Sequence, residues 1–292
     1  MTTIERNQPR VRRQGFSLRT FLSYGYTRVG LVITFAVVAI VIVGPFVAPY
    51  GPYDIVGAPF SEPTSTALLG TDVLGRDVLS RVLVGGFNVL WMATAATLLG
   101  VGAGLIVGVT AGYCGGATDV TIMRVVDILL AFPALILVML VTSLIGPSPF
   151  VITLLVALAW LPSSARVMRG ATSEVRNQDY VLAAQVNGVP WWRIMRTEVL
   201  PNLTSPLMVE VGLRLTWSIS LIAALSFLGL GVQPPTADWG VMINENRDGL
   251  TVQPLGVIAP ASMVALFTIG TSFIAEGLSR MLGGIDRRQG GA

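Results

Sequence analysis

The sequence contains no histidine and no lysine. All 19 basic residues among its 292 positions are arginine. A phosphate-binding loop of the Walker type needs a lysine, so this chain cannot bind and hydrolyse ATP in that way. Without histidine there is no Ser-His-Asp or Cys-His catalytic site and no histidine-bearing zinc site. We therefore expect a chain that is not an enzyme, with no catalytic residue, metal or cofactor of its own.

Cysteine and charge are also scarce. The single cysteine, Cys114, excludes an internal disulfide, and we expect it to be a buried, small apolar residue. Charged residues make up 12% of the chain and hydrophobic residues 53%, and the mean hydropathy is +0.72. The apolar residues come in runs of about 20, the length that a helix needs to cross a bilayer. This composition predicts one all-α domain surrounded by membrane lipid, with no nucleic-acid partner.

The charges between the apolar runs predict how the chain is laid across the membrane. Arginine is concentrated before the first run, between the fourth and fifth runs, and after the sixth. Because cytoplasmic loops carry the excess of basic residues, these segments and both termini are predicted to be cytoplasmic. The six predicted spans are about 29–49, 88–111, 120–144, 150–168, 205–230 and 255–278. The predicted divisions are a basic arm at 1–28, a first helix at 29–49, an extracytoplasmic segment at 50–86, a membrane core at 87–280 containing a cytoplasmic loop at 172–204, and a tail at 281–292.

Glycines recur at four-residue intervals in the second run. Such a stripe lies near one face of a helix, where another backbone can approach closely. It predicts a helix-packing seam, either fixed within the bundle or sliding during a conformational change. The four residues are Gly100, Gly104, Gly108 and Gly112.

Four charged residues fall inside predicted spans: Arg124 and Asp127 in the third, and Glu210 and Arg214 in the fifth. Within each pair the residues are three or four positions apart, which makes them neighbours on a helix. Charges in a membrane are costly unless they are paired or hydrated. We expect two ion pairs, which either stabilise the inner part of the bundle or take part directly in a pathway or gate.

Residues 179–201 predict two short helices joined by a turn on the cytoplasmic face. Gly188 interrupts the helical pattern, and Pro190 favours the first turn of a second helix. Ala183 and Ala184 keep the surface of the first helix shallow, so that another protein could approach it closely. Taken alone, these residues indicate an interface whose partner is not specified.

This segment resembles the cytoplasmic loop of ATP-binding-cassette (ABC) import permeases, whose pattern is E-A-A, three residues, G, nine residues, I, one residue, L-P. Leu182 replaces the glutamate and Glu198 replaces the isoleucine, which puts a polar contact of the family's glutamate in doubt. In that family the loop docks into a groove on the ATPase. The resemblance therefore assigns a coupling loop that includes Ala183, Ala184, Gly188, Pro190, Leu200 and Pro201.

Three other segments resemble the dipeptide and oligopeptide (nickel) permeases in particular. They are the L-L-G-T-D and G-R-D-V-L-S-R motifs within 68–81, the stretch 112–133, and the L-S-F-L-G-L-G-V-Q-P-P and D-W-G motifs within 225–240. The resemblance covers about residues 29–288 and looks closest to the C-type subunit, the second of the two permeases in such systems.

The resemblance implies the six-helix fold of a type I ABC importer, in which 87–280 is the permease core and 172–204 the coupling loop. It implies a complex in the inner (plasma) membrane with a second permease subunit, two ATPase subunits or domains that bind ATP and Mg, and an extracytoplasmic binding protein that delivers a peptide. This chain would form half of the pathway. Nickel or another small solute is an alternative cargo, and an intramembrane enzyme and a passive channel are alternatives of other classes.

The predicted topology can be tested by cysteine labelling after Cys114 has been replaced. Cysteines introduced at Ser65 and Thr236 should react with an impermeant thiol reagent added from outside, because both positions lie in the predicted outer segments. A cysteine at Ser173 should react only after the membrane is opened. Outside labelling at Ser173 would contradict the six-span arrangement.

Overall fold

The structure, a computed structural model, describes residues 18–283, so most of the predicted basic arm and tail lies outside it. Within this range every regular element is a helix, apart from two isolated β-bridges in the 55–77 region, and loops connect the helices. Five helical segments are long and apolar enough to cross a membrane, and the bent pair α5–α6 makes a sixth if it is counted as one span. The predicted all-α membrane fold is confirmed.

Each predicted span corresponds to one helix or, in one case, to a helix pair. The elements are α1 (Leu18–Ser23), α2 (Gly25–Val47), α3 (Val78–Val84), α4 (Phe87–Cys114), α5 (Gly116–Leu130), α6 (Ala134–Ile145), α7 (Pro149–Arg176), α8 (Asp179–Val186), α9 (Trp191–Ile194), the π-helical η1 (Met195–Val199), α10 (Leu200–Phe227), α11 (Trp239–Asn246), the 3-10 helix η2 (Arg247–Gly249) and α12 (Leu255–Gly283).

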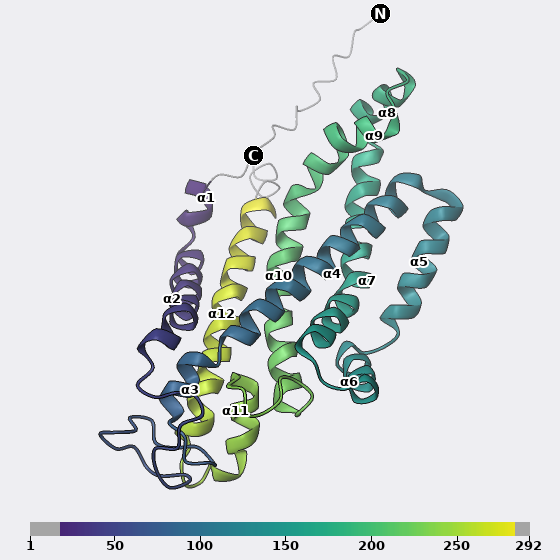
Figure 1. The fold of residues 1–292 in the computed structure, drawn as a ribbon. Helices are drawn as coiled ribbons and strands as arrows, with labels where there is room; N and C mark the ends of the chain where they lie inside the picture. Colours follow the sequence, from purple (N-terminus) through teal and green to yellow (C-terminus); the bar gives the residue numbers. More distant parts are fainter. Residues whose placement is uncertain (1–17, 284–292) are drawn as a thin grey trace, which may run out of the picture.

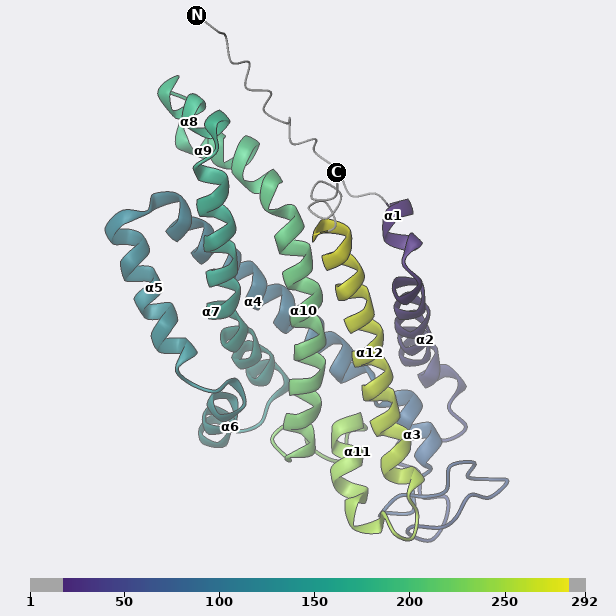
Figure 2. The same cartoon turned by 180° about the vertical axis from the view of Figure 1, so that it is seen from behind.

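The long helices form one bundle in which successive spans run in opposite directions (Figure 1). Both described chain ends lie at the same end of the bundle as α8 and α9, whereas α3 and α11 lie at the other end (Figures 1 and 2). Following the predicted topology, we call these the inner end and the outer end. The long segment before α3 also lies at the outer end.

The third predicted span is not one straight helix. It is broken between α5 and α6, whose axes differ by 77°. Pro133 is the residue before α6 and has an extended backbone. A proline lacks the amide hydrogen and disfavours a helical conformation at the residue before it, here Phe132, which favours the end of α5 at Leu130. Other helices extend past their predicted bounds: α7, for example, continues to Arg176, and α10 begins at Leu200.

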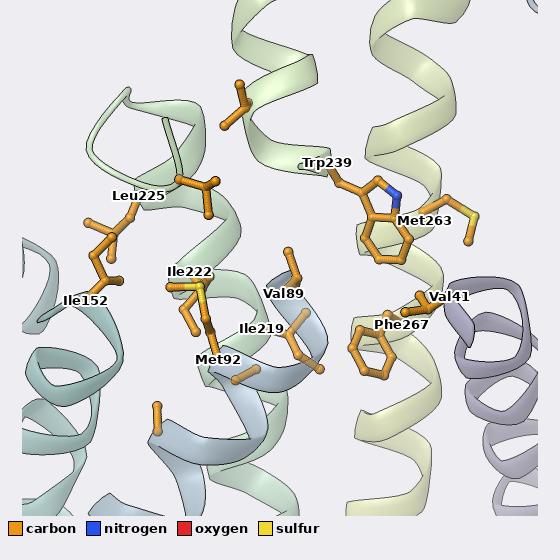
Figure 3. Close-up of a cluster of buried hydrophobic side chains, with 14 of the residues drawn as sticks. Val41, Val89, Met92, Ile152, Ile219, Ile222, Leu225, Trp239, Met263 and Phe267 are labelled. Carbon is orange, nitrogen blue, oxygen red and sulfur yellow. The ribbon is translucent and has the colours of Figure 1, made fainter. Parts of the chain in front are cut away.

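The main hydrophobic core occupies the outer half of the bundle and joins eight helices. Trp239 at the start of α11 is fully buried there, and its Nε1 donates a hydrogen bond to the carbonyl oxygen of Val82 at 2.9 Å. Figure 3 shows how side chains from α2, α4, α7, α10, α11 and α12 converge on this core. The outer ends of the spans are thereby packed together as one unit.

The glycine stripe of α4 is a packing seam against α7. All four glycines are buried. A Cβ added at Gly100 would lie 2.7 Å from the carbonyl oxygen of Ala157, and one at Gly104 would lie 2.6 Å from Ser164 Cβ. One at Gly112 would lie 2.7 Å from the carbonyl oxygen of Arg169. The two backbones are therefore so close that no side chain fits between them.

Cys114, the last residue of α4, is exposed rather than buried as predicted. It lies where the chain leaves the seam to turn into α5, and Gly115 at this turn has a left-handed backbone with φ of 66°. The expectation was wrong because it rested on residue type, whereas the turn that follows places this position at the surface.

Replacing Gly108 by alanine should separate α4 from α7. The added Cβ would meet the carbonyl oxygen of Ala165 and lie 2.8 Å from Met168 Cβ. Because overpacking of this kind typically costs about 1–3 kcal/mol, we expect a lower melting temperature of the detergent-solubilised protein. Gly102 in the same helix is the matched control, since a Cβ there meets nothing within 4 Å. Equal destabilisation by Gly102→Ala would contradict the seam.

Candidate functional site

The predicted coupling loop forms a compact turn between α8 and α9 at the inner end. Gly188 has φ of 73°, in the left-handed region that favours glycine. Its amide donates to the carbonyl oxygen of Gln185 at 3.0 Å, and the amide of Val189 donates to the carbonyl oxygen of Ala184 at 3.1 Å. These two bonds are the Schellman arrangement that ends a helix. Pro190 caps α9 from the preceding position rather than lying in its first turn, because its backbone is extended.

A second, smaller hydrophobic cluster fixes this segment to the bundle. Val181 of α8 and Ile194 of α9 are buried together with Val109 of α4, Val199 of η1 and Leu203 of α10. Tyr180 Oη also accepts a hydrogen bond from Asn202 Nδ2 of α10 at 3.2 Å. The cluster thus joins α8 and α9 to residues of α4 and α10, which belong to two of the spanning segments.

The junction with α10 has unusual helix geometry. Residues 195–199 form a π-helical turn immediately before Leu200 and Pro201. Pro201 has no amide hydrogen to donate, so the regular bonding pattern is interrupted at this point. π-Helical turns of this kind occur frequently at functional sites.

The opposite side of the segment presents apolar side chains to the surroundings. Val186 is 88% exposed and Trp191 is 66% exposed, and Trp192 and Leu182 are also exposed. Ala183 is exposed between them, and Ala184 is half-buried. Two exposed tryptophans beside an exposed valine are typical of a surface that binds another protein.

The predicted ion pair between Glu210 and Arg214 is present in α10, with 2.6 Å between Arg214 Nε and Glu210 Oε1. Ser164 of α7 donates to the same carboxylate oxygen at 2.7 Å. Farther along α10, Ser218 Oγ accepts a bond from Trp160 Nε1 at 3.0 Å and lies 3.0 Å from Thr97 Oγ1. These contacts connect α4, α7 and α10 through polar groups inside the bundle.

The predicted pair between Arg124 and Asp127 does not form. Asp127 is instead paired with Arg166 of α7, with 2.7 Å between Arg166 Nη2 and Asp127 Oδ1. About two turns nearer the inner end of α5, Asp119 is paired with Arg169. The i,i+3 spacing had suggested a partner within α5, but α7 packs beside α5 and supplies arginines that compete for the aspartates. Sequence spacing could not identify these partners, because they lie on a different helix.

A cluster of four charges, three of them buried and one half-buried, links the motif within 68–81 to α11 at the outer end. Arg76 and Arg81 each lie within ion-pair distance of both Asp72 and Glu245, at 2.5–3.0 Å. Asp72 and Arg81 have no exposed side-chain surface. Because buried charges are costly when unpaired, this shared pairing holds the outer segment firmly on α11. In the sequence, this charge cluster was indicated solely by the presence of opposite charges in the two outer segments.

Asp238 caps α11 in the D-W-G motif, where its carboxylate accepts hydrogen bonds from the amides of Gly240 and Val241. Burial raises the pKa of Asp238 from its ordinary 3.8 to about 6, while the two amides act in the opposite direction. A raised pKa means that the folded protein disfavours the ionised carboxylate. The contribution of Asp238 to folding stability therefore falls as the pH rises from about 4 to about 6.

Replacing Asp72 by asparagine should destabilise the outer end. The change leaves two buried arginines with Glu245 as their remaining carboxylate in the cluster, and breaking a buried pair typically costs about 3–5 kcal/mol. The check is the thermal unfolding of the purified protein. Asp248→Asn is the matched control, because Asp248 is 87% exposed and lies 3.6 Å from Arg247. A melting temperature for Asp72→Asn equal to that of the control would show that the cluster adds no stability.

Comparison with known proteins places the chain among membrane transport components. Residues 104–283 match the family described as binding-protein-dependent transport system inner membrane component. The chain is 33% identical to the dipeptide transport system permease protein DppC of Haemophilus influenzae, over 86% of this chain and 87% of that protein. It is 32% identical to the probable D,D-dipeptide transport system permease protein DdpC of Escherichia coli, over 99% and 97%. It is 32% identical to the oligopeptide transport system permease protein OppC of Bacillus subtilis, over 88% and 85%.

Proposed function

Because the chain belongs to the family of binding-protein-dependent transport system inner membrane components, we propose that it is a permease subunit of an ATP-driven peptide importer. The similar proteins are named as dipeptide, D,D-dipeptide and oligopeptide permeases, and they match most of the chain. The observation that supports the proposal most directly is the segment 179–201, which joins an exposed apolar surface to two spanning segments.

In the proposed complex, two ATPase subunits or domains bind ATP and Mg, and the exposed surface of α8 and α9 docks on one of them. Leu182, where the family pattern has glutamate, is on this exposed side. The contact would therefore be mainly apolar, made by Leu182, Val186 and the two tryptophans. This arrangement is consistent with tight docking, because aromatic side chains provide much of the binding energy of interfaces.

The proposed mechanism is alternating access. Closure of the ATPases moves α8, and the buried contacts of Val181 with Ile194, Leu203 and Val109 transmit this movement to α10 and α4. The outer end, held by its charge cluster and the main core, moves as one body against a second permease subunit. Each permease supplies half of the pathway, and this chain performs no chemistry.

An extracytoplasmic binding protein would deliver the peptide to the outer end. The segments 50–86 and 231–254 supply the surface available there, and the buried charge cluster keeps their relative position fixed. A delivering protein needs roughly 800 Å² of contact per partner, which segments of this length can provide together with the second permease.

Measuring the affinity of the binding protein for dipeptides, longer peptides and nickel would distinguish a peptide from a metal as the cargo.

Gly188→Val should uncouple the transporter. The space around Gly188 is open, with nothing within 4 Å of an added Cβ, so the effect would come from the left-handed backbone alone. A β-branched residue in this conformation costs on the order of 1–3 kcal/mol, which would reorient α8 on the ATPase. We expect loss of peptide uptake and of substrate-stimulated ATP hydrolysis, with unchanged peptide binding by the binding protein.

Gly188→Asn is the matched control, because asparagine adopts the left-handed conformation with little strain. It should retain uptake close to that of the unmodified protein. Normal uptake by a membrane-inserted Gly188→Val complex would show that this turn does not carry the coupling.

A further inference from the structure

A cavity of about 440 Å³ lies between α5 and α7 in the inner half of the bundle. Five charged side chains and Met123 contribute to its lining. The charged residues are Asp119, Arg124, Asp127, Arg166 and Arg169. Its size is within the range of small-molecule binding sites, roughly 300–1,000 Å³.

Three charged residues of this cavity are exposed although they lie within membrane-spanning segments. Asp127 and Arg166 are 59% and 57% exposed, and Arg124 is also exposed. Such residues rarely face lipid, because a charge in the hydrocarbon region is costly. This face of α5 and α7 is therefore expected to face water or another protein subunit.

The cavity has one more positive charge than negative. Arg169 binds Asp119 and Arg166 binds Asp127, so each aspartate already has an arginine. Within residues 18–283, Arg124 has no carboxylate at ion-pair distance. A bound anionic group would complete its pairing, and a guanidinium binds a carboxylate in a fork of two hydrogen bonds.

A second cavity, of about 280 Å³, lies next along the same helices toward the outer end, where α5 meets α6. Phe132, Pro133 and Leu137 contribute apolar lining, and Arg214 lies with its guanidinium 5.3 Å from the ring centre of Trp160. The two cavities thus follow one another on one face, the first mainly charged and the second mainly apolar.

We propose that the α5–α7 cavity binds the C-terminal carboxylate of the transported peptide, with Arg124 as its ligand, before release at the inner end. The proposal rests on the proposed function. The carboxylate of a peptide finds its opposite charge in Arg124, while the apolar cavity beyond it accommodates side chains. Because each aspartate is paired with an arginine, a single positive charge remains unpaired in the lining. Binding through one arginine is weak enough to allow release.

The test uses the assembled transporter with p-benzoylphenylalanine in place of Met123 and a labelled peptide supplied by the binding protein. Irradiation during ATP turnover should attach peptide at position 123. The same photoreactive residue at Phe35 is the control, because α2 does not line the cavity and Phe35 is 76% exposed.

Arg124→Gln should lower the yield of the peptide adduct about tenfold, the effect of losing one charge-assisted hydrogen bond, and should lower peptide uptake. Arg280→Gln, an exposed arginine of α12, should change neither.

The outcomes separate this proposal from the proposed function. If the unmodified transporter takes up no peptide, the proposed function fails. If uptake is intact but position 123 forms no peptide adduct, or forms adducts with lipid alone, the cavity is not a peptide site and the inference is overturned. Equal adduct yields with and without the Arg124 guanidinium would also overturn the assignment of Arg124.

Discussion

In a bilayer two helix backbones can touch only where side chains are missing, and the contact between α4 and α7 depends on this condition. The glycine stripe brings the two helices so close that the rotation of α7 about its axis is fixed. With α7 held in this way, Arg166 and Arg169 are placed opposite the aspartates of α5, and Ser164 reaches Glu210 of α10. The polar arrangement inside the membrane is therefore a consequence of an apolar contact.

The two ends of the bundle are stabilised by different means. At the outer end, a cluster of four charges, three of them buried, and a fully buried tryptophan connect segments that are far apart in the sequence. At the inner end, α8 and α9 are held by a small apolar cluster and leave most of their surface exposed. Such an asymmetry suits a protein whose outer part moves as a unit and whose inner part receives force from a partner.

Features that depend on neighbouring residues could be predicted from the sequence. The left-handed turn at Gly188 and the pair between Glu210 and Arg214 both follow from local spacing. Features that depend on a second helix could not, because the sequence does not state which helices are adjacent. The pairing of Asp127 with Arg166 is one of these. The break between α5 and α6 could have been predicted from Pro133. The apolar run continues through this proline, however, so the hydropathy pattern does not indicate that the chain changes direction there.

The apolar surface of α8 and α9 also affects how stable the chain is in the cell before it joins the proposed complex. In the proposed complex the ATPase covers this surface, so a copy inserted without that partner would expose two tryptophans and a valine at the membrane surface. Exposed patches of this kind attract chaperones and proteases and promote association between copies. Under the proposed function, the amount of permease in the cell would follow the supply of ATPase, and surplus copies of the permease would be degraded.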